Sequence, residues 1–342
     1  MTTGSAVSHE VPLAAALAAA CSRHFASACE VIALAQVTGG ASRQTISFDI
    51  RLADGEQRKL ILRRDPPRLE GAPALDRGLA ASRATEYAVI SAMYKAGVPA
   101  PEPYFLLRPD DGLGEGFVMR RMPGTAIARK LLRDAEYAPA RPLIVAQLGE
   151  ALARIHAVDP AELPALPTAR ATDHIVMLRR TLDRLGACSP VFELALSWLE
   201  RRLPGDAPVR PLHGDFRTGN FLADSSGLTA VLDWEAPHLG DPFAELGWLC
   251  VKAWRFGQID RPAGGFGSRE QLWAAYEAAG GARVDPGRAR FWEIFGTLRW
   301  GIICLTQADR HLSGGERSVE LCTIGRRAAE NEYDLVELLR AA

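Results

Sequence analysis

The pattern of apolar and polar positions changes about a third of the way along the chain. Before that point it favours an amphipathic helix over 13–25, then short strands and one long helical stretch over 75–96, closed by Gly97 and Pro99. The strands are expected at Val31–Val37, Gln44–Leu52, Arg58–Arg64, Tyr104–Leu107 and Gly116–Met119. This order of strands and helix favours antiparallel pairing of neighbouring strands over a parallel doubly wound sheet.

The helical period dominates the rest of the chain. Helices are expected at about 140–157, 171–186, 190–203, 242–255, 269–279, 286–311 and 317–340. A polar strand-and-loop segment over 209–234 interrupts them. We therefore expect an α+β, bilobal fold with a small antiparallel-sheet lobe over 1–120, a hinge over 121–127 and a larger, mainly helical lobe over 128–342. Clefts between two lobes are preferred ligand sites.

Composition excludes several classes of protein. The 342 residues include 40 Lys and Arg against 41 Asp and Glu, a balance that argues against a globally basic nucleic-acid-binding protein. No apolar run reaches the ~18 residues of a membrane helix, and the first ten residues contain no Lys or Arg for a secretory signal. The six cysteines form no C-x-x-C pair, which fits a reducing compartment. We expect a cytoplasmic protein that binds neither nucleic acid nor membrane.

The segment over 209–234 carries the candidate chemistry. Asp215 precedes Asn220 by five residues, which is the spacing in the kinase motif H-R-D-x-x-x-x-N. Asp233 follows the apolar strand Leu228–Leu232, where the kinase D-F-G acid stands. Phosphoryl transfer requires such a set, with one carboxylate to accept a hydroxyl proton and further oxygen ligands to hold Mg²⁺.

The motif H-G-D-x-x-x-x-N, followed by L-D-W-E and G-D-P, resembles the aminoglycoside phosphotransferase family of small-molecule kinases. The resemblance extends through most of the chain and implies a protein-kinase-like fold that uses ATP and Mg²⁺. It implies that Asp215 is the catalytic base and that Asn220 and Asp233 are Mg²⁺ ligands.

The same resemblance implies supporting residues around this loop. Asp241 is expected to brace the catalytic loop, and His156, at the end of the helix LGEALARIH, has a structural role. His213 is expected to orient the loop rather than to transfer protons. The chain departs from the family pattern at Glu245, where many members have Asp.

The first lobe contains candidate nucleotide contacts. Gly39, Gly40 and Ser42 lie in the loop between the first two expected strands, where small residues let backbone N–H groups approach a phosphate. Met119 precedes the hinge, where backbone groups would bind the adenine edge.

The cation expected beside the phosphates is an arginine in this chain. Only four of the 40 basic residues are lysines, at positions 59, 95, 130 and 252. In the third strand, Arg63 takes the place of the lysine in the kinase motif V-A-I-K. Arginine is always charged and binds phosphate bidentately. The L-R-R run before a proline resembles an acyl-CoA dehydrogenase-associated branch of the family, in which Glu86 would be the partner carboxylate.

The acceptor is expected to bind to the C-terminal helices. Residues 255–342 contain twelve Arg, no Lys and twelve Asp and Glu, so there is no acidic excess for a polycationic aminoglycoside. The many large apolar residues there predict either helix core or a partly apolar pocket for a less polar alcohol, with Arg299 as a candidate contact for an anionic group. Residues 318–339 resemble the same branch, which implies a hydroxyacyl acceptor. The last helices are also a candidate homodimer surface.

The leading hypothesis is an ATP-dependent phosphotransferase that acts on a hydroxyl group of a small molecule. A non-catalytic nucleotide-binding module is the first alternative, because the usual lysine is absent. A metallohydrolase is the second, with His213, Asp215, His238 and Asp241 as ligands.

Overall fold

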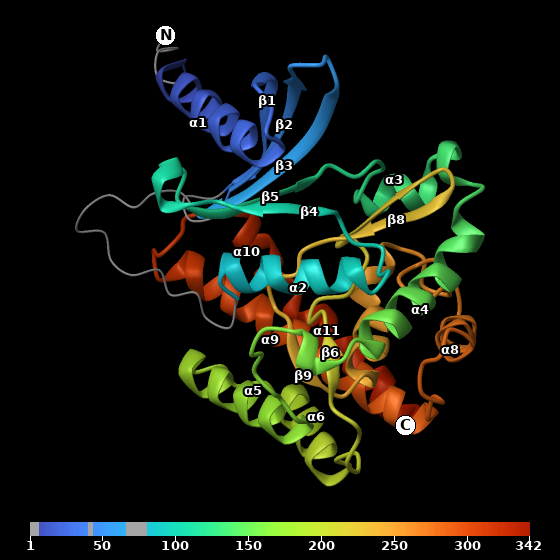
Figure 1. Ribbon diagram of the computed structural model, residues 1–342. Helices are drawn as coiled ribbons and strands as arrows, with labels where there is room; N and C mark the ends of the chain where they lie inside the picture. The colour runs from blue at the N-terminus through green and yellow to red at the C-terminus, as the bar shows by residue number, and fades with distance from the viewer. Residues whose placement is uncertain (1–6, 40–43, 66–80) are drawn as a thin grey trace. The chain divides into compact units, whose positions relative to one another are not determined.

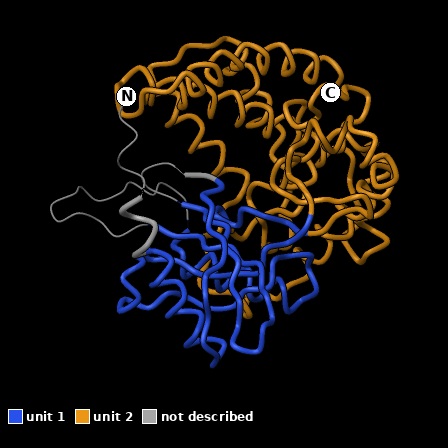
Figure 2. Tube along the Cα trace, turned by 90° about the horizontal axis from the view of Figure 1, so that it is seen from above, with its two compact units in different colours: residues 1–123, 230–236 blue, residues 124–229, 237–342 orange. Residues whose placement is uncertain are grey.

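The computed structural model describes residues 7–39, 44–65 and 81–342. The chain divides into two compact units, coloured blue and orange in Figure 2. Unit 1 comprises Met1–Pro123 and Ala230–Ala236, and unit 2 comprises Gly124–Thr229 and Pro237–Ala342. The short segment Ala230–Ala236 is joined to unit 1 by backbone hydrogen bonds from Val231 to Pro99 and from Ala81 to Glu235.

Unit 1 is built on a five-stranded antiparallel sheet with the strand order β1-β2-β3-β5-β4 (Figure 1). The strands are β1 (Cys29–Gly39), β2 (Gln44–Leu52), β3 (Gln57–Asp65), β4 (Pro103–Leu106) and β5 (Glu115–Arg120). Helix α1 (Val7–Phe25) packs against β1, and α2 (Arg83–Lys95) packs against β4 and β5. A short 3₁₀ helix, η1 (Pro109–Asp111), lies between β4 and β5.

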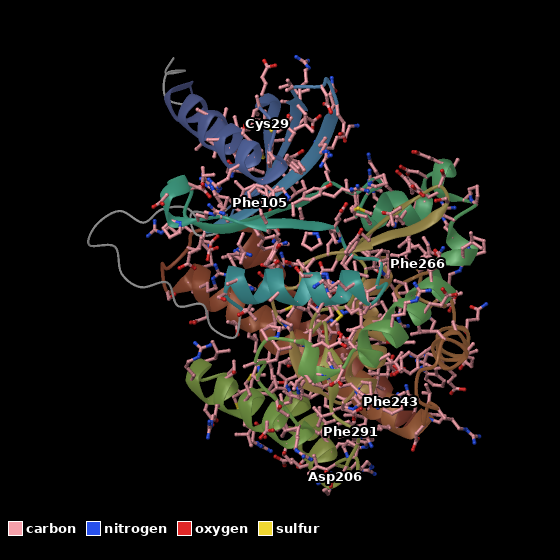
Figure 3. The ribbon with its side chains drawn as sticks, viewed as in Figure 1. Cys29, Phe105, Asp206, Phe243, Phe266 and Phe291 are labelled. Atoms are coloured by element: carbon pink, nitrogen blue, oxygen red, sulfur yellow. The ribbon has the colours of Figure 1, made fainter. Side chains whose placement is uncertain are left out.

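Alternation along β3 separates the two faces of this sheet. Leu60 and Leu62 are fully buried in an apolar core that also receives Leu17 of α1. Phe105 and Cys29, labelled in Figure 3, pack against the same core. Ile61 and Arg63 therefore lie on the opposite face of the sheet, and this face carries Arg63, the cation predicted to contact the nucleotide phosphates.

Unit 2 is mainly helical, and its packing is organised around the long helix α9 (Pro286–Leu312). The helices α5, α6, α7, α10 and α11 pack on α9, while α4 packs on α8. Their bounds are α3 (Ala128–Arg133), α4 (Arg141–Ala157), α5 (Ala171–Leu185), α6 (Pro190–Arg201), α7 (Phe243–Cys250), α8 (Arg269–Ala278), α10 (Val319–Arg326) and α11 (Ala328–Arg340). Three 3₁₀ helices connect them: η2 (Ala135–Tyr137), η3 (Pro160–Glu162) and η4 (Lys252–Arg255).

Helices α7 and α9 approach closely because of a glycine. A Cβ atom on Gly247 would lie 2.5 Å from the backbone carbon of Trp292, so no larger residue fits there without movement. Phe243 of α7 and Phe291 of α9 are both buried (Figure 3). This contact fixes α7, and α7 lies beside the polar loop that carries the candidate chemistry.

Two small pairs of strands frame that loop. Strand β6 (Arg210–Leu212) pairs antiparallel with β9 (His238–Gly240), and β7 (Phe221–Asp224) pairs with β8 (Gly227–Val231). The loop over 213–220 follows β6 directly and precedes β7.

The α+β class and the antiparallel sheet predicted from the sequence are confirmed. Several boundaries differ. The helix expected over 75–96 begins only at Arg83, because Ser82 caps it by accepting a hydrogen bond from the Thr85 backbone, while residues 75–80 lie outside the described part of the chain. The helix expected over 242–255 ends at Cys250, where Val251 adopts an extended ψ of 136°.

Two further differences concern short or continuous helical patterns. The pattern expected as one helix over 317–340 is divided at Arg327 into α10 and α11, and both helices pack on α9. Helix α3 and strand β9 were not predicted, because six-residue and three-residue elements carry too little periodicity. Among the described residues, no helix is both long enough and apolar enough to span a membrane.

Candidate functional site

The loop over 213–220 in unit 2 brings Asp215 and Asn220 into direct contact. The Asn220 side-chain amide donates to the Asp215 backbone carbonyl at 2.9 Å and to the Asp215 carboxylate at 2.6 Å. Asn220 is 7% exposed, whereas the side chain of Asp215 is 24% exposed. Because the amide nitrogen faces Asp215, the amide oxygen of Asn220 faces away from it. The predicted base is therefore held in place, and an oxygen of the predicted metal ligand is turned to the other side.

Two residues that the sequence analysis did not single out also hold the Asp215 carboxylate. Arg217 donates through Nε to both carboxylate oxygens at 3.1 Å, and its guanidinium lies 4.5 Å from the centre of the Trp254 ring. Trp248 of α7 donates its indole N–H to Asp215 Oδ1 at 2.8 Å. Arg217, two residues after Asp215, was visible as a nearby cation, but the Trp248 contact is formed only by folding.

The backbone of the loop is anchored by Glu245, which is 2% exposed. Its two carboxylate oxygens accept hydrogen bonds from the backbone N–H of His213 at 3.1 Å and of Gly214 at 3.0 Å. Gly214 has a φ of 87°, a conformation that favours glycine, and this allows both N–H groups to face one carboxylate. Glu245, noted from the sequence as a departure from the family pattern, is thus the residue that contacts the loop backbone.

His156 supports Glu245 from the opposite side. The Nε2 atom of His156 lies 3.1 Å from Glu245 Oε2, and its Nδ1 atom lies 2.9 Å from the Tyr276 hydroxyl. Burial would raise the pKa of Glu245, but the hydrogen bond and charge of His156 and the backbone donor of His213 outweigh it, so that pKa is lowered. His156 therefore stabilises the anchor rather than the reacting groups.

Asp241 lies elsewhere in the same unit. Its carboxylate accepts from Arg288 at 2.7 Å and from the Trp292 indole at 2.6 Å, and it caps the start of α7 through the Phe243 backbone at 3.0 Å. These contacts tie α7 to α9, so Asp241 is linked to the loop over 213–220 through the helix that carries Glu245.

In unit 1, Arg63 bridges two carboxylates. Its Nε lies 2.9 Å from Glu86 Oε1, and its second terminal nitrogen donates to Asp233 at 2.9 Å. Glu86 is fully buried and the Arg63 side chain is 14% exposed. Burial alone would lower the pKa of Arg63, but the two carboxylates raise it, so the guanidinium stays charged. A fork-shaped cation makes both contacts at once, which a lysine ammonium would do less readily.

Arg83 completes this network and was also missed. It contacts the second oxygen of Glu86 at 2.5 Å and Asp65 at 2.9 Å. Asp65, Arg83, Glu86, Arg63 and Asp233 thus alternate in charge along one chain of ion pairs. Asp233 sits in the left-handed region with a φ of 65°, which only a few residue types adopt easily.

The remaining predicted nucleotide contacts lie in or near β1, β3 and β5. Gly39 ends β1, while Gly40 and Ser42 lie outside the described residues. Met119 of β5 is buried and stands opposite Ile61 in the ladder, as Phe117 stands opposite Arg63. Residues opposite each other point to one face, so Met119 shares the face of Arg63.

The donor set of the predicted metal ligands fits Mg²⁺. Asn220 offers an amide oxygen and Asp233 a carboxylate, which are the hard oxygen ligands that Mg²⁺ prefers. The structure does not support the ligand set expected for a metallohydrolase. In the part of the chain that the structure describes, no three His, Cys, Asp or Glu side chains are grouped so that they could hold a metal ion. Asp241, one of its four proposed ligands, is bound instead by Arg288 and Trp292.

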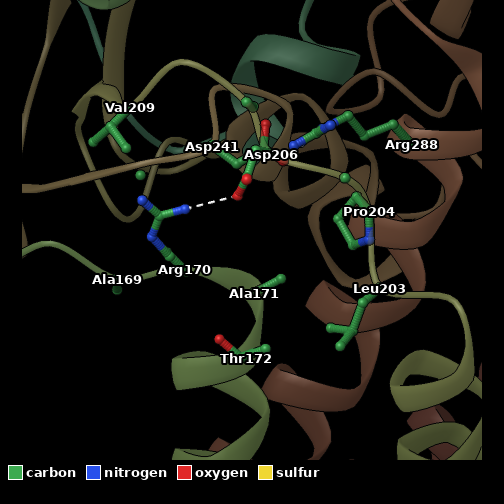
Figure 4. Close-up of a pocket in the computed structure, with 13 residues that line it drawn as sticks. Ala169, Arg170, Ala171, Thr172, Leu203, Pro204, Asp206, Val209, Asp241 and Arg288 are labelled. Atoms are coloured by element: carbon green, nitrogen blue, oxygen red, sulfur yellow. Dashed lines mark hydrogen bonds and ion pairs between the residues drawn. The ribbon is translucent and has the colours of Figure 1, made fainter.

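Two cavities in unit 2 lie apart from Asp215. A cavity of about 170 Å³ adjoins the N-terminal end of α5, where Arg170 pairs with Asp206 at 2.8 Å (Figure 4). A larger one, about 550 Å³, lies between η4 and α11 and is lined by Lys252, Arg327 and Tyr333, among others. The larger cavity adjoins the 3₁₀ helix that carries Trp254, the ring contacted by Arg217, because Lys252 in the cavity lining belongs to the same helix.

With this geometry in hand, comparison with known proteins identifies the family. Residues 34–289, about three quarters of the chain, match the model of the phosphotransferase enzyme family. The chain belongs to this family. The matched region includes Arg63, Glu86, Asp215, Asn220 and Asp233.

Individual relatives and solved structures are similar to this chain over different shares of their lengths. Mouse acyl-CoA dehydrogenase family member 10 is 31% identical over 228 residues, which are 64% of this chain but only 20% of that protein. A putative aminoglycoside phosphotransferase from Ralstonia eutropha JMP134 superposes with a TM-score of 0.72 at 22% identity, covering 96% of this chain and 98% of that one. A thermostable mutant of aminoglycoside phosphotransferase APH(4)-Ia, in ternary complex with AMP-PNP and hygromycin B, gives 0.58 at 19% identity, covering 96% and 98%. The predicted kinase-like fold is thereby confirmed.

The buried network of ion pairs in unit 1 predicts a stability effect. Arg63→Ala leaves one oxygen of the fully buried Glu86 without its cation, so we expect the free energy of unfolding to fall by about 3 kcal/mol. Arg51→Ala is the matched control, because Arg51 pairs with Glu30 at an exposed site and its removal is expected to cost under about 1 kcal/mol. Urea unfolding of both variants measures the difference. Equal losses would contradict the network.

The Glu245 anchor predicts a pH dependence. Since the folded-state pKa of Glu245 lies below its ordinary value of 4.5, its ionised form contributes stability that is complete above that value and is lost as the pH falls below it. Glu245→Gln removes this contribution. The gap in unfolding free energy between wild type and Glu245→Gln, about 3 kcal/mol at pH 7, should narrow below pH 4.5. The exposed Glu150→Gln should show no such gap, and a gap independent of pH would contradict the assignment.

Proposed function

We propose that the chain is an ATP-dependent phosphotransferase that phosphorylates a hydroxyl group of a small molecule. The observation that carries the proposal is the pairing of Asp215 with Asn220, in which the carboxylate is held by hydrogen bonds and still exposed in part. A structural carboxylate would be expected to be buried against its partners. A carboxylate that is oriented by hydrogen bonds but still accessible is suited to accept a proton from a substrate.

In this proposal Asp215 is the catalytic base. It accepts the proton of the acceptor hydroxyl as the acceptor oxygen forms its bond to the γ-phosphorus of ATP. The bond from that phosphorus to the β–γ bridging oxygen breaks, and ADP leaves with the electron pair. The proton then passes from Asp215 to solvent. Because little covalent chemistry falls to the protein, the precise holding of Asp215 is its main contribution.

The other predicted residues bind and orient the nucleotide. Asn220 and Asp233 would hold Mg²⁺, which when bound neutralises charge on the phosphates. Arg63 would contact the phosphates, with Glu86 fixing its guanidinium. Gly39, Gly40 and Ser42 would offer backbone N–H groups, and Met119 would lie beside the adenine. The neighbour crystallised with AMP-PNP supports a nucleotide at this fold.

The acceptor class is proposed from the C-terminal helices and from the relatives. Their balanced charge disfavours a polycationic aminoglycoside, and the similarity to an acyl-CoA dehydrogenase family member supports a hydroxyacyl compound. The six cysteines are all free, which supports a cytoplasmic setting. A homodimer through the last helices stays a prediction.

A non-catalytic nucleotide-binding module is the remaining alternative. It is favoured by the lysine that is absent from β3. The contacts of Arg63 weigh against it, because an arginine that already bridges Glu86 and Asp233 occupies the position of the lysine in the kinase pattern.

Substitution of Asp215 tests the proposal. Asp215→Asn keeps the size of the side chain but removes the proton acceptor, so we expect phosphoryl transfer to fall by about 10²–10⁴-fold. Binding of MgATP, measured by calorimetry, should be retained. Arg63→Ala should instead weaken MgATP binding, because it removes the cation proposed to contact the phosphates.

The control for this experiment is Asp224→Asn, an equivalent change in β7 at a carboxylate that bonds to the nearby Ser226 and to the Gly227 backbone. It should leave both binding and transfer unchanged. Transfer that survives in Asp215→Asn would refute the assignment of the base.

A further inference from the structure

Helix α7 contacts the candidate base at two levels. Glu245 and Trp248 are three residues apart and so share one face of the helix. Glu245 holds the backbone of the loop at His213 and Gly214, and Trp248 reaches the side chain of Asp215 itself. The helix thus determines both where the loop lies and how its carboxylate is turned.

The three side chains that hold the carboxylate differ in their freedom to move. Asn220 fixes Oδ2 at 2.6 Å, and Trp248 fixes Oδ1 at 2.8 Å. Arg217 spans both oxygens at 3.1 Å, but its side chain is 26% exposed. The rigid donor to Oδ1 is therefore Trp248, which is only 4% exposed.

The Trp248 ring is locked by its neighbours. Its centre lies 5.1 Å from that of Trp254, in an edge-to-face contact, and the Arg299 guanidinium lies 4.6 Å from the same ring. On another side the ring meets Gly296 of α9, where a Cβ would approach it to 3.2 Å. A ring packed in this way holds its N–H in one direction.

The other tryptophans of this cluster show that the contact is not a general property of its indoles. The buried N–H groups of Trp254 and Trp300 have no hydrogen-bond partner among the described residues. Trp248 alone of these three aims its donor at an ionisable group.

We propose that Trp248 is a positioning residue, whose indole N–H fixes Oδ1 of Asp215 and so orients the carboxylate toward the acceptor hydroxyl. This inference rests on the proposed role of Asp215 as the base. An approaching acceptor hydroxyl must hydrogen-bond to a lone pair of the Asp215 carboxylate that now accepts from Arg217. Because the Arg217 side chain is partly exposed, it can move away and free that lone pair. Trp248 and Asn220 then keep the carboxylate in place during transfer.

The test is Trp248→Phe, which preserves a ring against Arg299 and Trp254 but removes the N–H donor. With MgATP as the phosphoryl donor and water as the acceptor, followed by phosphate release, we expect kcat to fall on the order of 10- to 100-fold. The KM for MgATP should stay at the wild-type value, since the contact of Trp248 is with Asp215, the proposed base, and not with a predicted nucleotide ligand. A rise in the KM for MgATP together with the fall in kcat, or an unchanged kcat, would overturn the inference.

Trp300→Phe is the matched control. It removes a buried indole N–H from the same aromatic cluster, but one that has no partner. It should leave kcat and KM at their wild-type values, and thermal melting of both variants checks that each is folded. An equal fall in kcat for the two variants would show that only packing matters.

A spectroscopic measurement tests the contact without relying on activity. The chain has seven tryptophans, so its ¹⁵N-indole NMR spectrum should show seven Nε1–H signals. Trp248→Phe should remove one signal, and Asp215→Asn should shift that same signal more than the other six. Assignment through the wild-type spectrum keeps this test available if Trp248→Phe does not fold.

The outcomes separate the two proposals. If Asp215→Asn leaves the Trp248 signal in place, the indole N–H does not sense the charge of the Asp215 carboxylate and the inference fails. If that signal shifts but Asp215→Asn still transfers phosphate, the proposed base is wrong and the positioning role fails with it. A shifted signal together with the kcat loss in Trp248→Phe supports the inference.

Discussion

The buried carboxylate of Glu245 is the constraint on which the arrangement in unit 2 depends. A carboxylate at 2% exposure is costly, and here its charge is compensated by two backbone N–H groups and by His156. Those two N–H groups begin the loop that presents Asp215. Because Glu245 belongs to α7, and α7 is tied to α9 through Asp241 and Gly247, the position of the candidate base is set by the packing of the helical core.

Unit 1 solves a related problem with different residues. Glu86 is fully buried and is compensated by two arginines, which connect it to Asp233 on one side and to Asp65 on the other. The scarcity of lysine thereby acquires a structural meaning. An arginine in β3 contacts two carboxylates through its fork, and Arg83 satisfies the oxygen of Glu86 that Arg63 does not reach. The charge network of unit 1 is thus built around two arginines.

Sequence reasoning predicted the parts whose signal is local. The alternation in Gln44–Leu52 fixed that strand to the residue, and the Asp215–Asn220 spacing predicted a pair that the fold brings into contact. Pairs that are far apart in the sequence were less accessible. Arg63 and Asp233 are 170 residues apart, and they were predicted in separate roles, at the phosphates and at Mg²⁺, so the contact between them was not predicted. The Trp248 contact carried no signal, because an indole in an apolar helix is usually core and its hydrogen bond depends on tertiary packing.

The activity proposed for this phosphotransferase-family chain is transfer of the γ-phosphoryl group of ATP to an alcohol. The most direct measurement is acceptor-dependent ADP release from MgATP, across hydroxyacyl, amino-sugar, choline-like and macrolide alcohols, with ³¹P NMR of the products. We expect at least one of these classes, with hydroxyacyl compounds favoured, to release ADP in step with a new phosphate monoester. MgATP binding without a phosphate ester from any of these alcohols would contradict it and favour a non-catalytic nucleotide-binding module.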